Sequence, residues 1–127
     1  MSPLRFFITR RKTDRHLGDV ASGVFSALGI TESEERYSSN YPPDEHYFAG
    51  YCENAEVTVS DGDDDRVPDY PFHVSVEDSS WRIGRGVIAT EVASIAKALV
   101  AGGFTAFVPA GAWYQTDWDG DGDVYAA

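Results

Sequence analysis

Carboxylates are the side chains of this sequence most able to do chemistry, and one dense run of them lies near the middle of the chain. Residues 61–69 (DGDDDRVPD) join two segments that alternate like β-strands. Adjacent carboxylates repel one another, so such a run favours a hard cation or the Lys and Arg side chains of a partner. A tight hairpin needs about two connecting residues, whereas this connection has about eleven. The extra length favours a binding function, with a solvated loop as the alternative.

A second acidic run, residues 117–124 (DWDGDGDV), resembles the first eight positions of an EF-hand calcium loop. Asp117, Asp119 and Asp121 would supply oxygen ligands, and Gly122 would make the sharp turn. Such a loop also needs a bidentate Glu at its twelfth position, and the sequence ends at the eleventh. We therefore interpret residues 119–127 as a flexible acidic tail, with weak calcium binding as an alternative.

The other reactive side chains show no spacing typical of a nucleophile with its base or of a metal centre. His16, His46 and His73 lack the i, i+4 spacing of a metal-binding helix, and we expect all three at the surface. The single cysteine, Cys52, is expected to be a small buried apolar side chain. No glycine cluster matches a phosphate-binding or dinucleotide-binding loop. The sequence thus predicts no cofactor, no structural metal and no enzyme, with a small enzyme built from scattered residues as an alternative.

Hydrophobic periodicity predicts the elements that position these side chains. Residues 14–28 and 91–101 place apolar side chains three or four residues apart, as amphipathic helices do. Residues 55–60 and 72–77 alternate strictly, which indicates antiparallel strands with one solvent-facing side. Further strands are expected at residues 4–9, 47–53 and 104–108 and, as an option, at 113–118. Residues 30–45 are expected to be mostly loop, with an optional short strand near residues 35–38. The order β-α-β-β-β-α-β predicts an α+β fold, in which a largely antiparallel sheet has two helices packed on one face. Its 127 residues suit a single domain, residues 1–127.

The charge of the chain is strongly negative and unevenly distributed. The net charge is −11, and residues 31–78 alone carry −12. Such a field repels nucleic acid and anionic membranes and attracts basic proteins, although acidity can also serve solubility alone. The N-terminal apolar run, residues 4–8, is too short and too charged for a signal peptide or a membrane span. We therefore expect a cytoplasmic monomer that binds neither nucleic acid nor membrane.

Aromatic side chains beside acidic ones are the candidate anchors for a basic partner. Tyr and Trp are over-represented at binding hot spots, especially inside a polar rim, although each can also simply cover the edge of a core. The candidate partner-binding residues are Glu34, Glu35, Tyr41, Asp61, Asp63, Asp64, Asp65, Asp69, Tyr70 and Trp118.

Three segments and the acidic run between them resemble small acidic immunity proteins, which bacteria make against contact-dependent and other polymorphic toxins. They are residues 35–41 (ERYSSNY), 47–50 (YFAG) and 70–76 (YPFHVSV). The resemblance covers the middle third of the chain and lies in size, acidity and order, so it assigns no individual site residue. It implies an inhibitor that binds one cognate toxin, often over the active site of a basic nuclease. The alternative is a DNA-mimic or anti-restriction-type protein directed at a nucleic-acid-binding host enzyme.

Overall fold

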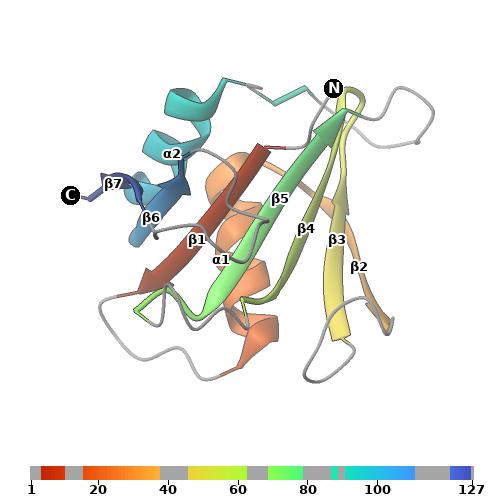
Figure 1. Cartoon of the computed structure of the whole chain (residues 1–127). Coiled ribbons are helices and arrows are strands. Elements are labelled where there is room, and N and C mark those ends of the chain that lie inside the picture. Colours follow the sequence, from red (N-terminus) through yellow and green to blue (C-terminus); the bar gives the residue numbers. More distant parts are fainter. Residues whose placement is uncertain are drawn as a thin grey trace.

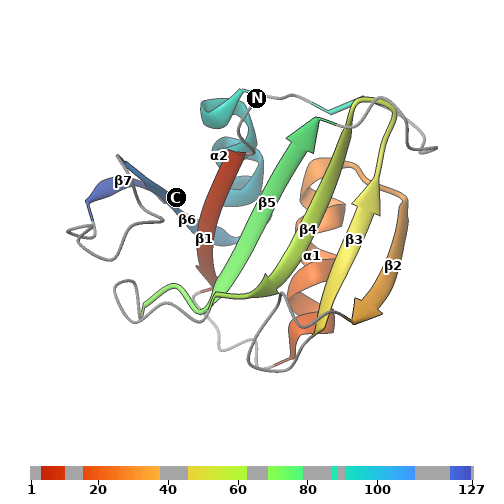
Figure 2. The ribbon, with the colours of Figure 1, turned by 45° about the vertical axis from the view of Figure 1, so that its right-hand side comes forward.

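Strands of one antiparallel sheet and two helices that cover one of its faces make up the described part of this chain (Figures 1 and 2). The computed structural model describes residues 4–10, 16–37, 46–62, 69–78, 87–88, 91–110 and 121–126. In chain order the elements are β1 (Leu4–Arg10), α1 (Leu17–Leu28), β2 (Glu32–Tyr37), β3 (His46–Tyr51), β4 (Ala55–Asp61), β5 (Phe72–Asp78), α2 (Val92–Ala101), β6 (Phe104–Pro109) and β7 (Gly122–Tyr125). The strand order is β2-β3-β4-β5-β1-β6-β7, and every pairing is antiparallel. The predicted α+β class is confirmed.

The main core lies between the two helices and the sheet. Alternation along β4 and β5 turns Val57, Val59 and Val74 toward the helices, and all three are fully buried. On the helix side, α1 buries its Val20 and Phe25 stripe, whereas α2 buries Ile95, Ala96 and Leu99. Gly29 ends α1 with a φ of 75°, a left-handed conformation that glycine adopts at little cost, and its N–H faces the last helical carbonyls. The two predicted helices are therefore confirmed; residues 14 and 15 lie outside the described part.

Strand β2 begins earlier than the short strand expected near residues 35–38, in a segment otherwise expected to be loop. It pairs with β3 along its whole length, from Glu32 opposite Tyr51 to Tyr37 opposite His46. Five of its six residues are exposed, because β2 is an edge strand beside which the core has already ended. A strand with two exposed faces needs no apolar alternation, so the pattern that revealed β4 and β5 is absent here. Residues 113–118, the optional last strand, lie outside the described residues.

Strand β7 corrects the interpretation of residues 119–127 as a flexible tail. Residues 122–125 pair with β6, with Val124 opposite Phe107. The Tyr125 side chain is half-buried against the main core. Gly122 allows the close approach, because a Cβ there would collide with the carbonyl oxygen of Val108 and the ring of Phe107. The two apolar side chains of this acidic stretch were too few to predict a strand from the sequence. The strand forms because these residues pair with β6.

Removing β7 should therefore destabilise the protein. We expect deletion of residues 121–127 to lower the free energy of unfolding by about 1–2 kcal/mol, because a half-buried tyrosine loses its contact with the core. Gly122→Ala should reproduce much of the loss, whereas Asp123→Ala, which changes an exposed side chain of the same strand, should not. Urea unfolding followed by circular dichroism measures all three. Equal stability of the truncated and full-length chains would show that β7 adds nothing to the fold.

The sheet face opposite the helices, here called the outer face, is not uniformly solvent-exposed as the alternation predicted. Ala49, Ser60 and Ser75 point to this face and are at most 6% exposed. Phe7 and Phe107 form a second, smaller apolar cluster on it. The period of two correctly separates the two faces, but it does not show how much of each face is covered.

Candidate functional site

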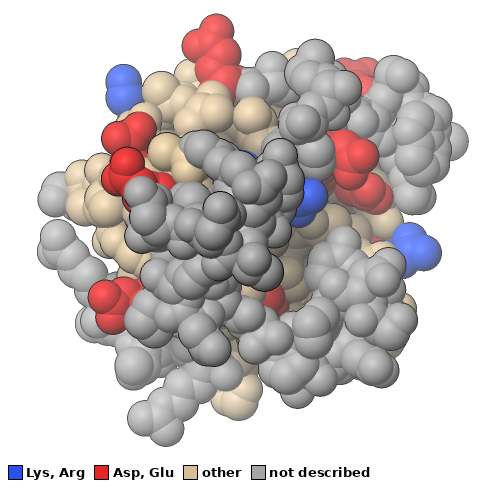
Figure 3. Space-filling model, in the orientation of Figure 1, with Lys and Arg blue, Asp and Glu red and all other residues tan. Residues whose placement is uncertain are grey.

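A row of side chains crosses four adjacent strands at one end of the outer face. Glu32 on β2 lies opposite Tyr51 on β3, Tyr51 lies opposite Glu56 on β4, and Glu56 lies opposite Glu77 on β5. We call these four residues the acidic row. Figure 3, drawn in the orientation of Figure 1, shows acidic side chains gathered where the upper ends of β3, β4 and β5 lie. The sheet thus presents three carboxylates and one phenol from a continuous hydrogen-bonded backbone.

Two members of the acidic row carry the same charge at directly paired positions. Glu56 and Glu77 face each other across β4 and β5, where paired Cβ atoms are about 5 Å apart. Like charges directly opposite each other destabilise a sheet, and an opposite charge placed over them relieves the repulsion. The pairing therefore places two carboxylates side by side on the outer face.

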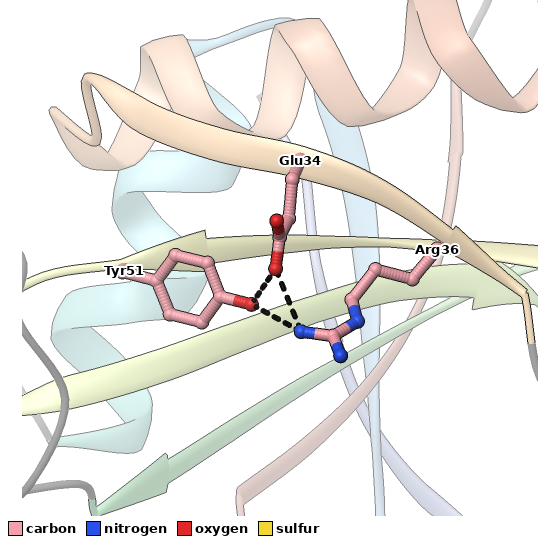
Figure 4. Close-up of polar contacts among 3 residues, drawn as sticks. All are labelled: Glu34, Arg36 and Tyr51. Atoms are coloured by element: carbon pink, nitrogen blue, oxygen red, sulfur yellow. Dashed lines mark hydrogen bonds and ion pairs between the residues drawn. The ribbon is translucent and has the colours of Figure 1, made fainter.

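Hydrogen bonds fix the position of the phenol in the acidic row (Figure 4). The Tyr51 hydroxyl donates to Glu34 Oε1 at 2.5 Å, and Arg36 donates to the same oxygen at 2.7 Å and to the Tyr51 hydroxyl at 3.1 Å. Partial burial and the hydrogen bond to Glu34 raise the pKa of Tyr51, so its hydroxyl stays protonated at neutral pH. Exposed ion pairs such as Arg36–Glu34 contribute little to stability, so the main consequence of the triad is an oriented tyrosine.

A groove of about 480 Å³ lies on the other side of β2, between that strand and α1. Phe25, Ile30 and Phe48 supply its apolar surface, whereas Ser22, Ser26 and Ser33 are among its polar lining residues. Its size is within the range of ligand pockets, which are typically 300–1,000 Å³. The groove thus lies on the helix-facing side of β2, and Glu32 of the acidic row lies on the outer face of the same strand.

A polar cluster lies on β2 and β3 beside the groove. His46 Nε2 is 3.1 Å from Glu35 Oε2, and the Tyr37 hydroxyl donates to Glu35 Oε1 at 3.0 Å. The Tyr37 ring stacks on His46 with centroids 4.9 Å apart, and His46 in turn contacts the groove residue Phe48. Because Glu35 accepts a hydrogen bond from Tyr37 and lies beside His46, we assign this cluster to the ordering of β2.

The structure separates several predicted site residues. Glu34 and Glu35 are neighbours in sequence but point to opposite faces of β2, so only Glu34 adjoins the acidic row. Asp61 ends β4, and Asp69 and Tyr70 precede β5, so these three lie at the end of the sheet away from Glu56 and Glu77. Tyr70 is half-buried against Phe107. The remaining predicted residues lie outside the described part of the chain, namely Tyr41, Asp63, Asp64, Asp65 and Trp118.

Four residues of the site were missing from the sequence-based prediction, namely Glu32, Tyr51, Glu56 and Glu77. The alternation of the two strands already placed Glu56 and Glu77 on the polar face. What the sequence lacked was the register, since a shift by one residue moves every side chain to the other face. Tyr51 was included in a predicted strand, but without a strand at β2 it had no acidic neighbour on that side.

The two half-buried histidines correct a further expectation. His46 begins β3 instead of lying in a loop, and His73 packs against Phe7 on the outer face with ring centroids 4.9 Å apart. His16 is exposed, as predicted. Cys52 is 1% exposed, as expected, and its Sγ donates to the Ala55 carbonyl oxygen at 3.3 Å. Burial raises the pKa of this thiol, which is unfavourable for a nucleophile.

Comparison with known proteins gives no relative from which a role could be transferred. No protein-family model, curated protein or solved structure matches the chain. Among the described residues, no helix is long and apolar enough to cross a membrane. The same residues include no group of three or more His, Cys, Asp or Glu side chains that could hold a metal ion. Asp117 and Asp119 of the calcium-loop resemblance lie outside the described ranges.

Proposed function

We propose that this protein is an immunity-type inhibitor that binds a cognate basic toxin, a nuclease, and covers its active site. The observation that carries the proposal is the acidic row, where Tyr51 lies between the carboxylates of Glu32 and Glu56. An oriented aromatic side chain inside a charged rim is the typical composition of a binding hot spot. The protein then acts by binding and not by catalysis, as a monomer, in the cytoplasm where the nuclease would meet its substrate.

The mechanism follows from the chemistry of a nuclease surface. A nuclease holds phosphates with Lys and Arg side chains, and carboxylates can occupy the same positions in place of phosphate. A net charge of −11 accelerates the encounter with such a surface, because opposite fields steer association. Glu56 and Glu77 present two neighbouring carboxylates, an arrangement that suits a Lys or Arg side chain of the partner. Occlusion of the substrate-binding cations is sufficient for inhibition.

The test uses two variants that change charge equally at opposite ends of the sheet. The candidate partner, a basic nuclease domain to be sought in the genes beside this one, is assayed for nuclease activity with increasing amounts of the wild type, Glu77→Lys or Asp69→Lys. Glu77→Lys should weaken inhibition by about tenfold or more, because a like charge then faces the basic partner. Asp69→Lys should have much less effect. Both side chains are exposed, and the lysine introduced by Glu77→Lys would face Glu56, so the first variant should keep or gain stability.

Four results separate the possibilities. Loss of inhibition with Glu77→Lys alone supports the proposal. Loss of inhibition with Asp69→Lys alone would move the interface to the other end of the sheet, where the acidic run of residues 61–69 begins. No inhibition by the wild type would overturn the proposal, and inhibition of a host nucleic-acid-binding enzyme instead would favour the DNA-mimic alternative.

A further inference from the structure

We infer that β2 accepts an extended segment of the basic partner as an additional strand, and that this segment alternates basic and apolar side chains. The inference rests on the proposed function, which it deepens by naming the shape and side-chain pattern of the partner. It uses the backbone of β2, the carboxylates on its outer face and the groove on its other face.

The first argument is the position of β2. It is the last strand at one end of the sheet and, in the described residues, pairs only with β3. Five of its six residues are exposed. The second edge of such a strand presents backbone donors and acceptors in the spacing that an added strand requires.

The second argument is the difference between the two faces of β2. Glu34 points to the outer face beside Tyr51, whereas its neighbour Ser33 lines the groove above Phe25 and Ile30. Side chains of a paired strand alternate in the same way, so those of an added strand would point in turn over the carboxylates and toward the groove. Basic residues suit the first position, and apolar residues suit the second.

The third argument identifies the occupant. β2 carries three Glu side chains against one Arg, and the whole chain has a net charge of −11, so two copies of this chain would repel each other at this edge. The charges therefore disfavour a second copy of this chain and favour a strand that carries Lys or Arg. Charged edge strands are known to prevent self-association, and here the excess of one sign also selects the partner.

The experiment uses synthetic eight-residue peptides with blocked termini as probes. The first alternates Lys and Leu, and the second has the same composition in two blocks. Two further peptides repeat the first with N-methyl groups on either the Lys or the Leu residues, because alternate N–H groups of a strand point to opposite edges. Affinity is measured by titration, and hydrogen exchange of the β2 amides is followed by NMR.

Strand addition predicts an asymmetric result. The alternating peptide should bind about tenfold more tightly than the block peptide, and it should slow exchange of amides within Glu32–Tyr37. One N-methylated peptide should bind like its parent, and the other should bind about tenfold more weakly, because it loses the backbone hydrogen bonds to β2.

Groove occupation is tested with a matched pair of serines. Ser26→Gln adds volume to the groove without adding charge, whereas Ser94→Gln makes the same change on α2. Both serines are exposed on helices. The first variant should weaken binding of the alternating peptide several-fold, and the second should not.

The inference and the proposed function fail in different ways. Strand addition would be overturned by an equal loss of affinity with both N-methylated peptides, by β2 amides that stay unprotected, or by no peptide binding at all. Inhibition of the toxin that still depends on Glu77 would then leave the proposed function standing. Peptide binding with the predicted asymmetry, but without inhibition of any toxin by the wild-type protein, would keep the strand-accepting edge and overturn the proposed function.

Discussion

Replacing Gly50 with alanine is expected to lower the free energy of unfolding by about 1–3 kcal/mol, the typical cost of overpacking a core. Gly50 is a buried residue of β3 whose helix-facing side has no space for a methyl group. A Cβ there would lie 2.7 Å from Phe25 Cε1 and 2.9 Å from Ile30 Cγ2. Alanine is the better strand residue in itself, so the clash must exceed that small gain.

Gly18 and Phe25 provide the control and the rescue for this prediction. A Cβ on Gly18, inside α1, would meet only Phe48 at an ordinary contact distance of 3.6 Å. Gly18→Ala should therefore stabilise the protein by up to about 1 kcal/mol through helix propensity. Phe25→Leu removes the colliding ring atoms, so its cost should be smaller in the Gly50→Ala background than in the wild type. Urea unfolding of the four variants of this cycle measures the coupling, and strictly additive effects would contradict the predicted clash.

The same contacts connect the fold to the proposed strand-accepting edge. Phe25 and Ile30, which leave no room above Gly50, also line the groove beside β2. A side chain that displaces the Phe25 ring at Gly50 should therefore change the groove as well as the stability. Binding of the alternating peptide to Gly50→Ala should weaken in parallel with its loss of stability.

The core could be predicted because its hydrophobic pattern is local in the sequence. The site could not be predicted, because it depends on the register between strands, which is not a local property. Val57 and Val74 are identified by neighbours two residues away, since a strand alternates with a period of two. Glu56 and Glu77 become neighbours only when β4 and β5 pair in one particular register, although they are separated by twenty residues in the sequence. The sequence therefore specified which face each side chain occupies, but not which residues meet on that face.

Edge strands show the same limit in a different way. Residues of β2 and β7 are mostly exposed, so their side chains carry little of the apolar signal that marks a central strand. Some of the acidic residues that the sequence analysis placed in loops and in a tail therefore lie on strands, where their positions are fixed. Glu32 and Glu34 illustrate the consequence: a segment interpreted mostly as loop supplies two of the carboxylates around Tyr51.

Replacing Tyr51 with alanine should speed dissociation of the basic partner by about thirtyfold, which corresponds to a hot-spot contribution of about 2 kcal/mol. The triad with Glu34 and Arg36 holds the phenol in place before binding, so little side-chain entropy is lost in the complex. Tyr47→Ala is the matched control, because Tyr47 lies on the same face of β3 but outside the acidic row. Tyr51→Phe separates the contribution of the ring from that of the hydroxyl.

Charge substitutions should act mainly on the association rate constant of the complex with the basic partner. Glu77→Lys should slow association, and the association rate of the wild type should fall steeply as salt rises, because screening acts within about 8–10 Å at physiological ionic strength. The dissociation rate should change less with salt, since it depends on desolvated contacts such as that of Tyr51. Binding kinetics at several salt concentrations measure both rates with the same toxin domain. An association rate that neither salt nor Glu77→Lys changes would show that the acidic row is not in the interface and that its charge serves solubility. An unchanged dissociation rate for Tyr51→Ala would show that the ordered phenol is not an anchor.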